Sequence, residues 1–129
     1  MERKAKIIVF WILTIVGFLT HSLTDAMPAF WGVSIAALEP PVSTGMIAFM
    51  MTMTYLIPVI GILLTMYGGR ICLTINAVLA CTMALFTVLH MAELIEEFYA
   101  AQLVIMPMMA VIAIIMAINS LKVRKEEKV

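Results

Sequence analysis

The sequence predicts an all-α membrane protein, a four-transmembrane-helix bundle, and three observations support this prediction. Hydrophobic residues make up 64% of the 129 residues and charged residues only 12%, whereas soluble domains contain about 45–50% and about 25%. The apolar residues form four runs, each close to the roughly 20 residues that a helix needs to cross a bilayer. The basic residues all lie at the ends of these runs. Residues 1–129 are therefore expected to form a single transmembrane domain.

The expected spans cover about residues 7–23, 46–67, 71–91 and 100–121. The first run follows three basic residues, as the apolar region of a signal peptide does. It is longer than that region usually is, however, and no small-residue cleavage site follows it. We therefore expect it to be retained as the first span.

The connection between the first two spans, residues 26–45, is too apolar for a free loop. Pro28 suits the first turn of a helix, and Trp31 belongs in the aromatic belt at the level of the lipid headgroups. A short interfacial helix is expected from about Pro28 to Leu38. Ser43 or Thr44 is then expected to cap the second span.

Prolines are expected to bend the second and fourth spans. Pro58 has no N–H, and its ring displaces the carbonyl of Thr54, four residues earlier. Thr52, Thr54 or Tyr55 can satisfy the freed backbone groups. Pro107 is expected to bend the fourth span.

The basic residues decide the predicted topology. They lie before the first span, in the turn between the second and third spans, and after the fourth span, at Arg3, Lys4, Lys6, Arg70, Lys122, Arg124, Lys125 and Lys128. In a four-span protein these three places share one side, and the positive-inside rule makes that side the cytoplasm. We expect a multi-pass protein of a bacterial inner membrane with both termini in the cytoplasm.

The other two connections carry acids and no Lys or Arg. Their acids are Asp25, Glu39, Glu93, Glu96 and Glu97. An unpaired acidic rim raises the local concentration of cations. The predicted outer face is therefore one that attracts cations.

The end of the third span combines a histidine with several of these acids. In the segment TVLHMAELIEEFY, residues 87–99, His90, Glu93 and Glu97 are spaced i, i+3 and i+7 and so share one helical face. In lipid, a semi-polar face of this kind is expected to point at neighbouring helices. Followed back along the span, the same face carries Thr87, Met83, Asn76 and Cys72.

The first span ends in a second pair of this kind, His21 and Asp25, spaced i, i+4. The first and third spans end on the same side of the membrane, so the two histidines of the chain are expected at one depth. Neutral imidazoles with charge-balancing carboxylates suit Zn²⁺, Mn²⁺ or Fe²⁺, and facing helices can build such sites. The predicted metal ligands are His21, Asp25, His90, Glu93 and Glu97.

Other ligands fit parts of the same pattern. The two histidines could hold a b-type haem, although carboxylates lie beside them and no glycines make room for a macrocycle. Alternatively, the cluster could shuttle protons or capture an organic cation, and the residues assigned to this substrate are Trp31, Tyr55, Glu96, Tyr99 and Gln102. The thirteen methionines suit Cu(I) in type. They are spread around the helices, however, as apolar filler is.

The sequence does not favour an enzyme. Ser22 directly follows His21 and therefore points about 100° away from it on a helix. No nucleophile and base, phosphate-binding loop or basic patch with interleaved aromatics is present, so no nucleic-acid partner is expected. Cys72 and Cys81 lie within one span at a spacing that excludes a disulfide between them.

Part of the pattern resembles a known group of proteins. The first span ends in an acid, the second contains Ile57-Pro58-Val59, and a short turn with Arg70 leads to Asn76 in the third. In these features the chain is similar to small four-helix bacterial membrane proteins grouped with the DoxX-like families. The resemblance implies a four-span bundle. It does not extend to the histidines or the glutamate cluster.

Two functions are therefore expected from different classes. The leading one is a protein that binds or transports a cation, above all a divalent metal, at the outer cluster. The rival is a structural or accessory subunit of a larger membrane complex. Under either function the partners are the lipid bilayer and a second copy of the chain or a membrane complex.

The topology predicts that a cysteine placed at the turn between spans two and three is shielded in intact cells. In a Tyr67→Cys variant that keeps Arg70 and whose native Cys72 and Cys81 are changed to alanine, an impermeant maleimide should react only after the membrane is permeabilised. Labelling in intact cells would place this turn outside and reverse the orientation.

Overall fold

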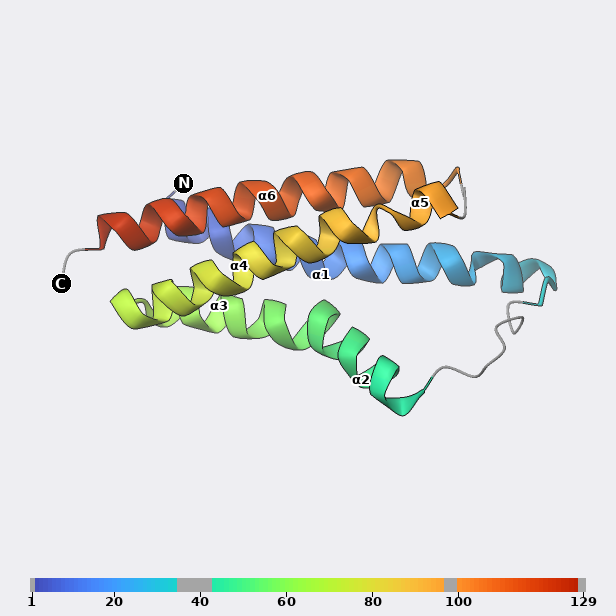
Figure 1. The fold of residues 1–129 in the computed structure, drawn as a ribbon, viewed down its shortest axis with the longest axis horizontal. Coiled ribbons are helices and arrows are strands. Elements are labelled where there is room, and N and C mark those ends of the chain that lie inside the picture. Colours follow the sequence, from blue (N-terminus) through green and yellow to red (C-terminus); the bar gives the residue numbers. More distant parts are fainter. Residues whose placement is uncertain (1, 35–42, 97–99, 128–129) are drawn as a thin grey trace.

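A computed structural model describes residues 2–34, 43–96 and 100–127, and in these ranges the chain is all-helical (Figure 1). Its elements are α1 (Arg3–Ala26), η1 (Met27–Trp31), α2 (Thr44–Met51), η2 (Thr52–Leu56), α3 (Ile57–Tyr67), α4 (Arg70–His90), α5 (Glu93–Glu96) and α6 (Gln102–Glu126). Within the described residues, four helical segments are long and apolar enough to cross a membrane: Arg3–Trp31, Thr44–Tyr67, Arg70–Glu96 and Gln102–Glu126. This confirms the expectation of four helices that are long and apolar enough to span a membrane. Most extend a few residues beyond the apolar runs, because a helix continues into its polar ends.

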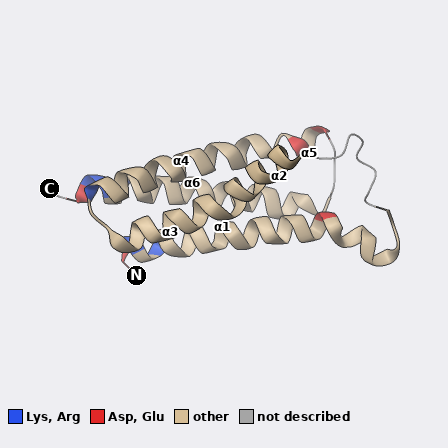
Figure 2. Ribbon diagram, turned by 90° about the horizontal axis from the view of Figure 1, so that it is seen from below, with Lys and Arg blue, Asp and Glu red and all other residues tan. Residues whose placement is uncertain are grey.

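The four spans lie side by side along one axis. Both termini and the α3–α4 turn lie at one end, and η1 and α5 lie at the other (Figure 1). We call the first the basic end, because Lys and Arg gather there, and the second the acidic end, which holds Asp25, Glu93 and Glu96 (Figure 2). At the basic end, Arg3 pairs with Glu126, and Lys4 Nζ lies 3.3 Å from Glu127 Oε2. These pairs join the start of α1 to the end of α6.

A buried polar chain ties three helices together in the interior. The indole Nε1 of Trp11 on α1 donates to Asn76 Oδ1 on α4 at 2.9 Å, and Asn76 Nδ2 donates to Ser120 Oγ on α6 at 3.1 Å. All three side chains are fully buried. Met83 and Thr87 lie on the same face of α4 as Asn76 and are buried too, and Cys72 is half-buried. This semi-polar face of the third span therefore points into the bundle, as predicted.

The remaining helix, α3, reaches the same point through a glycine. A Cβ built on Gly61 would lie 2.2 Å from Cε2 of the Trp11 ring, so only a residue without a side chain allows the α3 backbone to lie against the indole. All four spans therefore meet at the Trp11–Asn76–Ser120 chain. Apolar side chains fill the core around it, among them Ile7, Phe18, Leu73, Met83, Met109 and Met116.

The second span departs from a simple proline kink. A π-helical turn, η2, precedes Pro58, and the Ile57 N–H bonds to the carbonyl of Thr52, five residues back. The hydroxyls of Thr52 and Thr54 donate to the carbonyls of Ala48 and Met50, each at 2.8 Å. The extra residue of a π turn loosens the helix where proline removes a donor. The α2 half of this span angles away from α1 in Figure 1.

The connections agree with the predictions in part. Ser43 Oγ accepts from the Met46 N–H at 3.1 Å and caps α2, as expected. Between spans one and two, the 3₁₀ turn η1 follows α1 directly and ends at Gly32, which has a φ of 75°. Of the predicted interfacial helix from Pro28 to Leu38, residues 28–31 belong to η1, no helix is present at residues 33–34, and residues 35–38 lie outside the described residues.

The buried polar chain predicts that Asn76→Ala destabilises the protein. The change leaves the indole N–H of Trp11 without an acceptor in a dry core, where an interhelical hydrogen bond contributes roughly 0.6–2 kcal/mol. Asn119→Ala is the matched control, because Asn119 bonds only to the Ile115 carbonyl of its own helix. Thermal melting in detergent should show a clear loss for Asn76→Ala and a small one for the control. Equal melting temperatures would mean that the buried chain adds no stability.

The contact at Gly61 predicts a loss from adding a single methyl group. Gly61→Ala forces the Trp11 ring away from α3, and overpacking of this kind costs about 1–3 kcal/mol. Gly45→Ala in α2 is the control, since its Cβ would meet only Ser43 Oγ, at 3.9 Å. Melting should fall for Gly61→Ala and stay level or rise for Gly45→Ala. A Gly61→Ala protein as stable as wild type would show that the indole can move freely.

Candidate metal site at the acidic end

The site is assembled from three helix ends. His21 lies near the end of α1, His90 is the last residue of α4, and Gln102 opens α6. After His90 the chain makes a short turn, in which the Ala92 N–H bonds to the Leu89 carbonyl, and Glu93 then begins α5. The helix break does not remove Glu93 from His90, so the predicted i, i+3 pair is preserved.

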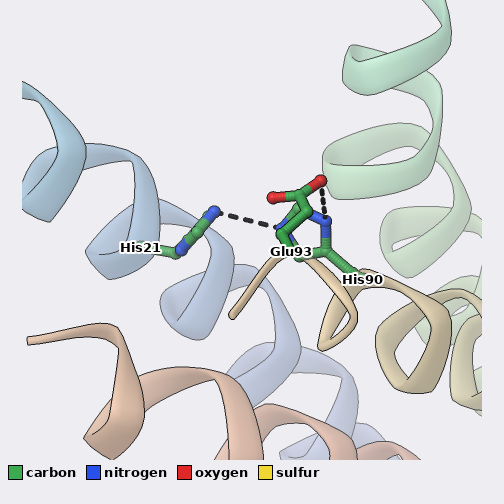
Figure 3. A group of neighbouring side chains, drawn as sticks. All are labelled: His21, His90 and Glu93. Carbon is green, nitrogen blue, oxygen red and sulfur yellow. Dashed lines mark hydrogen bonds and ion pairs between the residues drawn. The ribbon is translucent and has the colours of Figure 1, made fainter. Parts of the chain in front are cut away.

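The two histidines meet across α1 and α4. His90 Nε2 lies 3.1 Å from His21 Nε2, and the rings are edge-on, with centroids 4.9 Å apart and planes at 82° (Figure 3). Each side chain is only 11% exposed. The structure therefore brings together the two histidines that the sequence placed at one depth.

Two carboxylates flank the imidazoles and face the surface. Glu93 Oε1 lies 2.8 Å from His90 Nδ1, and Asp25 Oδ2 lies 3.5 Å from His21 Nε2. The exposed fractions of the two acidic side chains are 62% and 55%. One ligand atom from each of His21, His90 and Glu93 falls within 4.8 Å of the others, which is a spacing that can hold a metal ion.

Gln102 lies behind His21 and not at the mouth of the site. It is only 3% exposed. Its Oε1 lies 2.8 Å from His21 Nδ1, and its Nε2 lies 2.5 Å from Asp25 Oδ1 and 3.4 Å from the His21 carbonyl. The sequence grouped Gln102 with substrate contacts, whereas in the structure its amide is engaged by two other residues of the site.

An aromatic cluster lies one helical turn deeper than the histidines, and the sequence reasoning did not single it out. The ring of Phe86 stacks on His90 with a centroid distance of 5.8 Å and an interplanar angle of 9°. Phe18 and Phe49 contact Phe86 at centroid distances of 5.9 and 6.2 Å. We call Phe18, Phe49 and Phe86 the aromatic floor. A phenylalanine three or four residues before each histidine was the available signal.

The other predicted residues lie elsewhere or outside the described ranges. Trp31 and Tyr55 are exposed at the end of η1 and in η2, and Glu96 is exposed at the end of α5. In the described part of the chain, no hydrogen bond or ring contact joins these three to the histidines. Glu97 and Tyr99 fall outside the described residues.

Polar atoms inside the described part of the bundle are satisfied. Every buried side-chain nitrogen or oxygen there has a hydrogen-bond partner. At the site, the two imidazole Nε2 atoms face each other and the carboxylates of Asp25 and Glu93 are exposed. These are the atom types that bind borderline transition metals.

No protein-family model, curated protein or solved structure matches this chain. The resemblance to DoxX-like proteins stays a prediction, and the function has to be argued from the residues themselves.

Proposed function

We propose that the protein binds one divalent transition-metal ion at the acidic end, with His21 and His90 as its principal ligands. The observation that carries the proposal is the 3.1 Å separation of the two Nε2 atoms. The two histidines lie on different helices and are 69 residues apart in the sequence. Two imidazoles that converge at this distance, with carboxylates around them, form a ligand set for Zn²⁺, Mn²⁺ or Fe²⁺.

The separation agrees with the geometry of a metal site. A zinc–nitrogen bond is about 2.0–2.1 Å long, so two nitrogens at the tetrahedral angle are about 3.3–3.4 Å apart. A movement of a few tenths of an ångström would therefore admit an ion between His21 and His90. Without an ion, the same separation suits an N–H···N hydrogen bond.

The acids supply charge and further ligands. Asp25 and Glu93 lie on the exposed side of the imidazoles and can neutralise part of the charge of a divalent ion. Glu96, exposed at the end of α5, adds to the acidic rim that concentrates cations. Imidazole ligands favour Zn²⁺ or Fe²⁺ over Mg²⁺ and Ca²⁺, which prefer oxygen ligands alone, and the carboxylates also suit Mn²⁺.

The geometry favours an ion over the other ligands. Two axial haem ligands lie on opposite faces of the macrocycle, about two metal–nitrogen bonds or about 4 Å apart, whereas these nitrogens are 3.1 Å apart with the rings in contact. An organic cation would need aromatic faces near the acids, and Trp31 and Tyr55 make no ring contact with the histidines in the described residues.

The packing below the site favours binding over passage through the bundle. Beneath the aromatic floor, the fully buried side chains of Met83, Met116 and Trp11 fill the interior. A path for an ion would need open space lined by free polar groups, whereas the buried amide of Asn76 is bonded to Trp11 and Ser120. The acidic end faces the outside of a bacterial inner membrane in this proposal, and both termini lie in the cytoplasm, because the basic end follows the positive-inside rule.

The proposal predicts an ion-dependent rise in melting temperature. Chelator-stripped protein in detergent should be stabilised by Zn²⁺, by about 2.7 kcal/mol at a free concentration of about 100 times the Kd. His90→Ala should abolish the rise, because it removes one of the two converging nitrogens. Glu96→Gln, which changes an exposed acid of the same rim, is the matched control and should retain most of it.

The measurement compares each variant with and without the ion. His90 is nearly buried and stacks on Phe86, so His90→Ala also lowers the melting temperature of the ion-free protein. Absence of any shift in the wild type, at concentrations far above a plausible Kd, contradicts metal binding. Stoichiometric co-purification with a membrane complex and no bound metal would instead support an accessory subunit.

A further inference from the structure

We propose that Gln102 is a positioning residue that sets the tautomer of His21 and so turns the Nε2 lone pair of that imidazole toward the ion. This inference rests on the proposed metal site. It assigns to a buried amide on α6 a role in the affinity of a site whose ligands come from α1 and α4.

The orientation of the amide follows from its neighbours. Gln102 Nε2 faces Asp25 Oδ1 at 2.5 Å and the carbonyl oxygen of His21 at 3.4 Å. A carbonyl oxygen accepts hydrogen bonds and does not donate them, and the same holds for the oxygens of an ionised carboxylate. The group of Gln102 that faces these two oxygens must therefore be its NH₂ group. If the amide were flipped, its oxygen would face two other acceptors.

The tautomer of His21 follows from the orientation of the amide. With its NH₂ group turned to Asp25, Gln102 presents Oε1 to His21 Nδ1 at 2.8 Å. An amide oxygen only accepts, so His21 Nδ1 must carry a hydrogen and donate it. In a neutral imidazole the other nitrogen, Nε2, then holds the lone pair.

His90 is oriented in the same way by a different group. Its Nδ1 lies 2.8 Å from Glu93 Oε1, a carboxylate oxygen that accepts the Nδ1 hydrogen. With an ion bound, both imidazoles would therefore direct Nε2 lone pairs at the same place. Without an ion, the 3.1 Å contact between the Nε2 atoms is a hydrogen bond, and the ion takes the place of its one hydrogen. Metal-bound histidines usually donate their second N–H in this manner, and loss of the acceptor lowers metal affinity about 10–100-fold.

Burial separates this role from that of a surface contact. Gln102 is 3% exposed and lies behind His21, so water cannot easily replace its oxygen as the acceptor for Nδ1. The same amide donates to Asp25 and holds that carboxylate close to the imidazole that it serves. A single residue thus orients one ligand and one neighbouring charge.

The test measures the affinity of the detergent-solubilised protein for Co²⁺ and Zn²⁺ in the wild type and in three variants. Gln102→Leu removes the acceptor and should weaken binding about 10–100-fold, with a changed visible spectrum of bound Co²⁺. The exchange of Gln102→Glu with Asp25→Asn in one protein keeps an oxygen for His21 Nδ1, preserves the net charge and reverses the bond between residues 25 and 102, so it should restore the affinity and the spectrum. Ser120→Ala, which breaks a buried bond far from the site on the same helix, should lower stability and leave the affinity unchanged.

A second measurement needs no variant. The chain has two histidines, so ¹⁵N-histidine labelling of the zinc-loaded wild type gives two resolvable imidazoles. The proposal expects both to bind the ion through Nε2 and to retain a hydrogen on Nδ1. Binding of His21 through Nδ1 would overturn the role of Gln102 and leave the metal site standing.

The outcomes separate the two proposals. Wild-type binding with equal affinity in Gln102→Leu refutes the positioning role alone. Weak binding by both Gln102→Leu and the Asp25→Asn/Gln102→Glu exchange also refutes it, because the retained acceptor for His21 Nδ1 would then have no effect. A wild type that binds neither ion refutes the metal site and the positioning role together.

Discussion

The Trp11–Asn76–Ser120 chain is the constraint on which the rest of the bundle depends. In lipid no water competes for a buried amide or indole, so an unpaired group there is costly. The chain satisfies the indole and the amide with each other and with one hydroxyl, and each belongs to a different span. Apolar packing alone would tolerate sliding of one helix against another, since one methyl group is much like the next. A fixed set of donors and acceptors permits only one axial register.

That register reaches the acidic end through stiff helices. His21 is about three turns beyond Trp11 on α1, and His90 is about four turns beyond Asn76 on α4. A slip of either helix by one turn would move one imidazole by about 5.4 Å and separate the nitrogens. The contact between the histidines is therefore a consequence of bonds made deep in the bundle, near its basic half. The site needs few residues of its own because the scaffold already determines where they meet.

Much of this could be predicted from local features of the sequence, and the rest depended on how helices rotate about their axes. The spans follow from the length of apolar runs, and the equal depth of His21 and His90 follows from the order of the spans. Contact between the two rings did not follow, because it depends on how α1 and α4 rotate about their axes. Asn76 was expected to bond to a neighbouring helix, but nothing local indicates that the neighbour is Trp11. The role of Gln102 was hidden for the same reason, because its position at the start of α6 gives depth and not direction. Proline lacks one backbone donor, and a helix can adapt to it by a kink or by a π turn. The sequence around Pro58 did not indicate the π turn, because the choice depends on how the span packs against its neighbours.

The π turn also inserts one extra residue between the α2 and α3 halves of the second span. The residues of α2 are therefore rotated about the helix axis relative to those of α3, compared with their places in a continuous α-helix. Deleting a single residue between Thr52 and Leu56 would turn the five-residue spacing into the four-residue spacing of an ordinary α-helix. The α3 half, held against Trp11 by Gly61, would keep its place. The α2 half would rotate by about 100°, and Phe49 would leave Phe86. The one extra residue of the π turn thus determines whether Phe49 packs on Phe86, below the two histidines, or faces lipid.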